Sequence, residues 1–217
     1  MDIFVKAKEQ LCYFAPQHNY TLNFYLAKDS KLRIYTFTFG KDSVRNNLNV
    51  IFCGKNGKAE LYGLYLPQQG QLIENNTFLH HKAPFCESFQ QYYGILSARG
   101  QAVFNGRILV EKQAQKTEAF LESKNILLSK EAQVLGRPFL EIKADDVKCT
   151  HAFSATQIEE DEIFYLRSRG IDKDKAKNIL LMSFAKKIIN KVDKPLVKEN
   201  LCAKISQFLN VKSGERN

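Results

Sequence analysis

The 217-residue sequence contains no tryptophan, only four histidines, and no apolar run near the roughly 18 residues that a membrane-spanning helix requires. Its first residues, MDIFVKAKEQLCYF, lack the basic segment and long apolar core of a secretory signal. The five cysteines are odd in number and irregularly spaced, which argues against a disulfide framework and favours a reducing compartment. These absences predict a cytoplasmic protein without a membrane span.

Motifs typical of several enzyme classes are also missing. The sequence has no G-x-x-x-x-G-K-[ST] loop to hold the phosphates of a nucleotide, and no hexapeptide repeat of the acyltransferase type. A carbohydrate-active enzyme would need paired acids in a groove, and the adjacent Asp145 and Asp146 point to opposite faces of an extended chain. We therefore expect a protein that is not an enzyme.

The positive charge is concentrated near the carboxyl end. The chain has 32 basic and 23 acidic residues, a net charge of +9. Within residues 172–217, ten lysines and one arginine stand against five acids, so this segment carries six of the nine excess charges. A nucleic-acid-binding module could have this charge, but no aromatic stacking platform accompanies the lysines. We expect a solvated helix face that can also meet an acidic partner, and no nucleic acid.

The first two-thirds of the sequence has the pattern of successive β-strands. Short polar or glycine-bearing turns separate apolar segments, and no long helical stretch intervenes, which disfavours βαβ architectures. The segments cover residues 32–39, 47–53, 58–66, 71–81, 91–97, 101–111, 123–129 and 139–145. Their even spacing fits a sandwich, a barrel or a β-helix, and the pattern alone does not choose between a β-helix and a sandwich.

The pattern changes to helical at Gln157. An acidic first turn, an apolar stripe and a following Gly170 predict a helix that ends at this glycine. Asp172 has the position of the N-cap of a second helix, and Pro195 separates that helix from a third. The sequence thus predicts a β body over residues 1–156 and a helical region over residues 157–217.

Two pairs of residues could ligate a metal. Leu140, Ile142 and Ala144 alternate with polar residues, and if this strand continues, Cys149 and His151 lie on one face about 6.5–7 Å apart. Zinc and iron–sulfur centres usually take four protein ligands, so other ligands must come from elsewhere or from a second chain. The alternative is a small buried cysteine and a hydrogen-bonded histidine.

The second pair is His81 and Cys86. Consecutive histidines on a strand point to opposite faces, so only one of His80 and His81 can join Cys86. The competing interpretation of this segment is an ordinary surface loop. Cys12, Cys53 and Cys202 have no partner in the sequence pattern.

Several long motifs, in order, resemble the carboxyl-terminal core of the SufB/SufD family. They are HHKAPFCESFQQYYGILS (80–97), FNGRILVEKQAQKTEAF (104–120), NILLSKEAQV (125–134), RPFLEIKADDVKCTH (137–151) and EIFYLRSRGI (162–171). The match is clearest over residues 80–189. The resemblance implies a flattened right-handed parallel β-helix followed by a small α-helical domain.

The resemblance also implies a function. Family members are non-catalytic scaffold subunits of the Suf iron–sulfur cluster assembly complex. A SufD-like chain would pair with SufB, or with itself, through the end of the β-helix, and would bind the SufC ATPase through its helical domain. It would bind no cofactor tightly when alone. In the assembled complex it would bind an iron ion or an iron–sulfur cluster transiently. A SufB-like subunit is the alternative, and a carbohydrate-active β-helix protein a more distant one.

Specific residues take roles from the resemblance. Cys149 and His151 would be ligands at the subunit interface, and Asp145 and Asp146 would attract iron. In the helical segment, Phe164, Tyr165, Arg167 and Arg169 are candidates for binding the ATPase, because aromatic and arginine side chains are enriched at binding hot spots. Alternatively, Phe164 and Leu166 dock this helix on the β body, and an arginine pairs with Asp145 or Asp146.

Two departures from the family are visible. Family scaffolds are commonly much longer, which suggests a short homologue or a fragment that lacks an amino-terminal region. The family usually follows its Cys-x-His with Gly-Ala-Thr, whereas His151 is followed here by Ala152 and Phe153. A close backbone approach that needs glycine is therefore not expected at this position.

Overall fold

The computed structural model describes residues 1–39 and 42–211, which form twelve strands followed by three helices. The strands are β1 (Asp2–Val5), β2 (Gln10–Phe14), β3 (Tyr20–Leu26), β4 (Lys31–Thr38), β5 (Val44–Phe52), β6 (Lys58–Tyr65), β7 (Leu72–His81), β8 (Glu87–Leu96), β9 (Gln101–Val110), β10 (Glu118–Leu127), β11 (Gln133–Ile142) and β12 (Lys148–Thr156). The helices are α1 (Glu160–Ser168), α2 (Lys173–Ile189) and α3 (Pro195–Val211). Residues 212–217 of the expected helical region lie outside the described residues.

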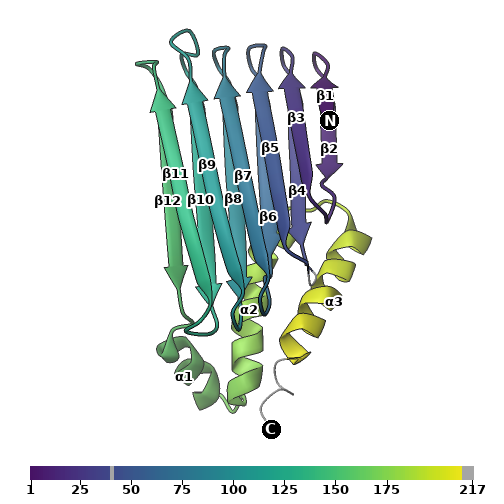
Figure 1. Ribbon diagram of the computed structural model, residues 1–217, viewed down its shortest axis with the longest axis vertical. Helices are drawn as coiled ribbons and strands as arrows, with labels where there is room; N and C mark the ends of the chain where they lie inside the picture. The colour runs from purple at the N-terminus through teal and green to yellow at the C-terminus, as the bar shows by residue number, and fades with distance from the viewer. Residues whose placement is uncertain (40–41, 212–217) are drawn as a thin grey trace.

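The strands form two parallel six-stranded sheets. Odd-numbered strands make one sheet in the order β1-β3-β5-β7-β9-β11, and even-numbered strands make the other in the order β2-β4-β6-β8-β10-β12. Consecutive strands therefore belong to opposite sheets, and each pair makes one turn of a solenoid (Figure 1). This confirms the expected parallel β-helix and excludes the sandwich.

Alternation along each strand builds the interior. In β5, for example, Leu48, Val50 and Phe52 are fully buried, while the residues between them are not. Their counterparts from both sheets fill the space between the layers as one apolar cluster. Outside, asparagines stack in register: Asn105 donates to Asn76 (2.6 Å), and Asn76 donates to Asn47 (3.0 Å). Such amide ladders suit parallel in-register strands.

The turns from odd to even strands repeat one backbone feature. A non-glycine residue with positive φ occurs in five successive turns, and its N–H donates to a carbonyl of the next turn. These residues are Lys8, Asp29, Asn56, Phe85 and Lys116. Each turn thus fixes the position of the following one.

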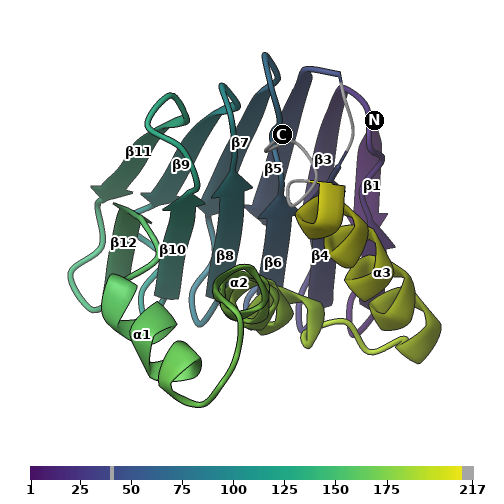
Figure 2. The same ribbon diagram turned by 90° about the horizontal axis from the view of Figure 1, so that it is seen from below.

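The helices cover the outer face of the even sheet (Figure 2). Aromatic and aliphatic side chains on this face, such as Tyr62 and Leu64, form a second apolar cluster with Leu181, Ile188 and Ile205 of the helices. None of the helices in residues 1–39 and 42–211 is long and apolar enough to cross a membrane.

Three of the expected helix boundaries are confirmed, whereas α1 begins at Glu160 and not at Gln157. Gly170 has φ +80° just after α1, where a left-handed residue ends a helix. Asp172 caps α2, its Oδ1 accepting from the N–H of Asp174 at 2.9 Å. Pro195 is the first residue of α3, where its missing N–H costs nothing.

Candidate functional site

The last turn of the solenoid, β11 and β12, leaves one side of each sheet unpaired. β11 pairs only with β9, and β12 only with β10. We call this the open end. Large apolar side chains of the edge strand β11 are exposed: Ile142 (41%) on its interior-facing side, and Leu135 (45%) and Phe139 (55%) on the outer face of the odd sheet. Unpaired strand edges with exposed apolar side chains favour pairing with another chain.

Cys149 and His151 lie on β12 at the open end. They pair in register with Ala119 and Leu121 of β10, both of which face the interior. The predicted common face is therefore present, directed toward the interior, while Thr150 between them lies on the outside. Cys149 is half-buried and His151 is exposed, because no further turn covers them.

The environment of Cys149 disfavours the thiolate. Burial raises the pKa of Cys149, and a backbone hydrogen bond at Ala119 opposes this only in part. A thiolate forms more readily next to a metal or cation. Among the described residues, no group of three or more His, Cys, Asp or Glu side chains could hold a metal ion. The open end therefore offers two ligands and needs others.

Asp145 and Asp146 are exposed in the turn that leads into β12. Asp146 forms an ion pair with Lys116 and accepts the Lys116 N–H at its carbonyl. The ion pairs in the described part of the chain do not join either aspartate to Arg167 or Arg169. The internal pairing considered from the sequence is therefore not seen.

His81 and Cys86 are both buried, although the turn between them exposes Lys82 and Phe85. His81 stacks on Phe52 (4.2 Å between ring centroids), and its Nε2 is 3.0 Å from Ser88 Oγ. Burial, with a smaller contribution from His80, lowers the pKa of His81 to about 3. Burial raises the pKa of Cys86 to about 11.

The two histidines face opposite sides, as the strand period predicts. His80 lies on the outer face, with its Nε2 3.0 Å from Glu111. His81 remains a neutral interior side chain, and Cys86 donates weakly to the carbonyl of Gly54 (3.4 Å). Neither His81 nor Cys86 is accessible to an incoming ion.

The surface of α1 presents the other candidate residues. Phe164 and Tyr165 are 71% and 57% exposed, and the Arg169 guanidinium lies 5.1 Å from the Tyr165 ring centroid. Ile163, rather than Phe164, is the buried residue that docks this helix. An exposed aromatic pair beside two arginines has the composition of a protein-binding surface.

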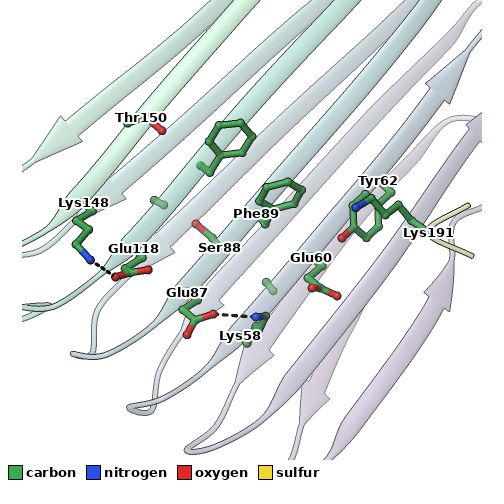
Figure 3. Close-up of a pocket in the computed structure, with 13 residues that line it drawn as sticks. Lys58, Glu60, Tyr62, Glu87, Ser88, Phe89, Glu118, Lys148, Thr150 and Lys191 are labelled. Atoms are coloured by element: carbon green, nitrogen blue, oxygen red, sulfur yellow. Dashed lines mark hydrogen bonds and ion pairs between the residues drawn. The ribbon is translucent and has the colours of Figure 1, made fainter. Parts of the chain in front are cut away.

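The sequence analysis missed a groove on the outer face of the even sheet. Its volume is about 440 Å³, and it lies beside the end of α2 (Figure 3). It is lined by Lys58, Ala59, Glu60, Tyr62, Glu87, Ser88, Phe89, Glu118, Ala119, Phe120, Lys148, Thr150 and Lys191. The outward, every-second-residue positions of β6 and β8 could have indicated it.

Ion pairs and aromatic rings border this groove. Lys58 pairs with Glu87 at 2.9 Å and Lys148 with Glu118 at 2.8 Å, while the rings of Phe89 and Phe120 stack at 4.9 Å. The Lys191 ammonium lies 5.7 Å from the centroid of the Tyr62 ring. The groove therefore supplies an aromatic surface with a charged border.

Comparison with known proteins identifies the family. The family described as "SUF system FeS cluster assembly, SufBD core domain" matches residues 16–184, which is most of the chain. This chain belongs to the SufBD family. The match covers β3 to β12, including the Cys-x-His strand, together with α1 and most of α2.

Several named proteins are similar to this chain over most of its length. The iron–sulfur cluster assembly protein SufD of Escherichia coli is 35% identical over 85% of this chain and 44% of its own length. An iron–sulfur cluster assembly SufBD family protein of Mycobacterium leprae is 37% identical over 86% of this chain and 50% of its own. A chloroplastic protein of Arabidopsis thaliana, ABCI7, is 33% identical over 77% of this chain. The chain spans about half the length of the first two relatives.

Proposed function

We propose that this chain is a SufD-like scaffold subunit that pairs, through the open end, with a SufB-like subunit or a second copy. The observation that carries the proposal is the open end itself. It combines two unpaired parallel edges, three exposed apolar side chains of β11, and Cys149 and His151. A facing chain would cover the apolar side chains and supply the missing ligands.

Iron or an iron–sulfur cluster is the cargo of this proposed site. Cysteine thiolate and histidine imidazole suit iron–sulfur chemistry. Cysteine binds a metal as the thiolate, so the Cys149 proton must leave when iron binds. Because burial raises the pKa of Cys149, loading should weaken as pH falls. Asp145, exposed in the preceding turn, would attract iron before it reaches these ligands.

The proposed role is structural rather than catalytic. Two ion pairs border the outer-face groove, and the family relatives are named for cluster assembly. All five cysteines are free, which suits a reducing cytoplasmic compartment.

Cysteine substitution tests the ligand assignment. We expect Cys149→Ser to reduce cluster loading of the reconstituted complex several-fold while the melting temperature stays within a few degrees. Cys53→Ser is the matched control, because Cys53 is exposed and lies in a turn away from β12. Loading is read from the visible absorption of the cluster. Equal loading in both variants would remove Cys149 from the site.

We further propose that α1 contacts a SufC-type ATPase. Phe164 and Tyr165 are the aromatic anchors, and Arg169 holds the Tyr165 ring. Deleting the helices would expose the apolar outer face of the even sheet, so surface substitutions give a cleaner test.

The test compares Phe164→Ala/Tyr165→Ala with Leu196→Ala, which removes an equally exposed apolar side chain from α3. We expect the double variant to lose at least about tenfold in affinity for the ATPase of the same organism, measured by calorimetry. Leu196→Ala should bind as the wild type does. Unchanged affinity in the double variant would move the contact away from α1.

A further inference from the structure

We propose that Gly136 and Phe153 act together as a specificity determinant of the open end. Phe153 fills the space above Gly136 and thereby fixes the separation of the two edges that a partner must match. This inference deepens the proposed function and rests on the proposed pairing through β11 and β12.

Phe153 is the large interior-facing side chain of the last turn on the even sheet. It pairs in register with Ser123, which is fully buried, so its ring points between the sheets. Across the interior, Gly136 of β11 pairs with the buried Phe104 and therefore also faces inward. The ring of Phe153 and the backbone of Gly136 thus meet in the final layer.

The contact leaves no room for a side chain at position 136. A Cβ on Gly136 would lie 2.1 Å from both Cδ2 and Cε2 of Phe153, well inside van der Waals contact. The backbone does not require glycine, because the only glycines with positive φ in residues 1–39 and 42–211 are Gly70 and Gly170. Glycine inside a strand often marks such a close approach. Gly136 is therefore needed for the ring and not for the conformation of β11.

The same ring determines the position of the candidate ligands. His151 and Cys149 lie two and four residues before Phe153 and share its face of β12. β12 is hydrogen-bonded on one side only, so contacts across the interior, among them the Phe153 ring on Gly136, hold it relative to β11. A facing chain must pair with both edges at once, so the separation of the edges decides which chain fits.

The test measures pairing affinity in a double-mutant cycle. The probes are the SufB-like subunit of the same organism and a second copy of this chain, with dissociation constants from analytical ultracentrifugation. The variants are Gly136→Ala, Phe153→Ala and Gly136→Ala/Phe153→Ala, and the melting temperature of each is recorded alone.

We expect Gly136→Ala to weaken pairing about tenfold or more, because the new methyl group displaces the ring and β12 with it. Adding Phe153→Ala should recover part of that loss, because the methyl group then occupies vacated space. Phe153→Ala alone keeps Gly136 and should weaken pairing too, which preserves the test if Gly136→Ala fails to fold. If the effects of the two substitutions on affinity are non-additive, by more than their effects on melting temperature are, the result supports a joint role of Gly136 and Phe153 in pairing.

Two outcomes would overturn the inference while leaving the pairing proposal intact: wild-type affinity in both single variants, or losses that simply add in the double variant. If the wild-type chain pairs with neither probe, the proposed pairing itself fails. The wild-type measurement thus separates failure of the proposed function from failure of this inference.

Discussion

The outer faces of the two sheets reach stability by different means. On the even sheet, outward tyrosines and leucines such as Tyr62 and Leu64 are buried beneath the helices. On the odd sheet, outward asparagines hydrogen-bond to one another along the solenoid, and charged residues such as Arg45 and Glu74 pair across strands. The strands are alike, and their outward side chains decide whether a face needs a cover. The apolar outward side chains of the even strands therefore determine where the helices dock.

The largest expected effect comes from a substitution in the apolar cluster between the helices and the even sheet. Ile188→Ala removes a fully buried side chain of α2, and we expect a loss of about 2–4 kcal/mol in the free energy of unfolding. Urea denaturation followed by circular dichroism measures it. Leu196→Ala, at a position 69% exposed, is the control and should change stability by less than about 0.5 kcal/mol. Similar losses in both variants would mean that the helices do not depend on this cluster.

An intermediate effect is expected on the uncovered face. Asn76→Ala removes one hydrogen bond to Asn47 and one from Asn105, and we expect a loss of about 1–2 kcal/mol. Asn49→Ala removes a donation to Asn23 and should cost about half as much. The same urea measurement applies. If Asn76→Ala cost no more than Asn49→Ala, the two hydrogen bonds of Asn76 would not both contribute to stability.

The smallest expected effect on stability comes from the nearly buried carboxylate of Glu122. Glu122, only 8% exposed on the even sheet, accepts from Tyr93 (2.8 Å) and Gln91 (3.0 Å) and pairs with Lys124 (2.6 Å). Burial alone would raise the pKa of Glu122, but these partners lower it overall. Its contribution is therefore complete above the unfolded-state pKa of about 4.3 and is lost as pH falls through the lower folded-state pKa.

We expect Glu122→Gln to lower the melting temperature by a few degrees at pH 7, and the gap from wild type to shrink below about pH 4. Glu74→Gln on the odd sheet is the comparison, since Arg45 also lowers the pKa of Glu74. Because the Arg45 side chain is 64% exposed, 0.5 M NaCl should remove the Glu74→Gln effect and spare that of Glu122→Gln. Equal salt sensitivity would contradict the distinction between the two faces.

Much of the fold could be predicted, and the unpredicted parts have physical reasons. Period-two alternation identified the later strands and the shared face of Cys149 and His151. The first three strands were not assigned, and β1 and β2 contain only four and five residues, too few to show a pattern. The choice of β-helix over sandwich came from the family motifs, because the two differ only in which strands pair.

The candidate sites were harder to predict than the strands. Cys86 follows a turn, yet it is buried, because burial at a turn depends on the turns stacked above and below it. Phe164 could be a docking residue or a surface residue on the helical period, and only the packing of Ile163 decided the matter. The outer-face groove is made by side chains from β6, β8, β10 and β12 and by Lys191 in the turn after α2, so no local stretch of sequence contains it.

The left-handed residues of the odd-to-even turns have a consequence for how the molecule comes apart. Each central turn of this kind is hydrogen-bonded to the turn before it and to the turn after it. Side-chain partners on neighbouring coils of the solenoid, such as Asn47 and Asn76, stand 29 residues apart. Such an array behaves as a one-dimensional chain of coupled coils. Unfolding starts at a terminal coil, which contacts one neighbouring coil instead of two. β12 belongs to such a coil and carries Cys149 and His151. A subunit bound to the open end would therefore prevent β12 from fraying. The candidate ligands Cys149 and His151 would be better ordered with that subunit bound than without it.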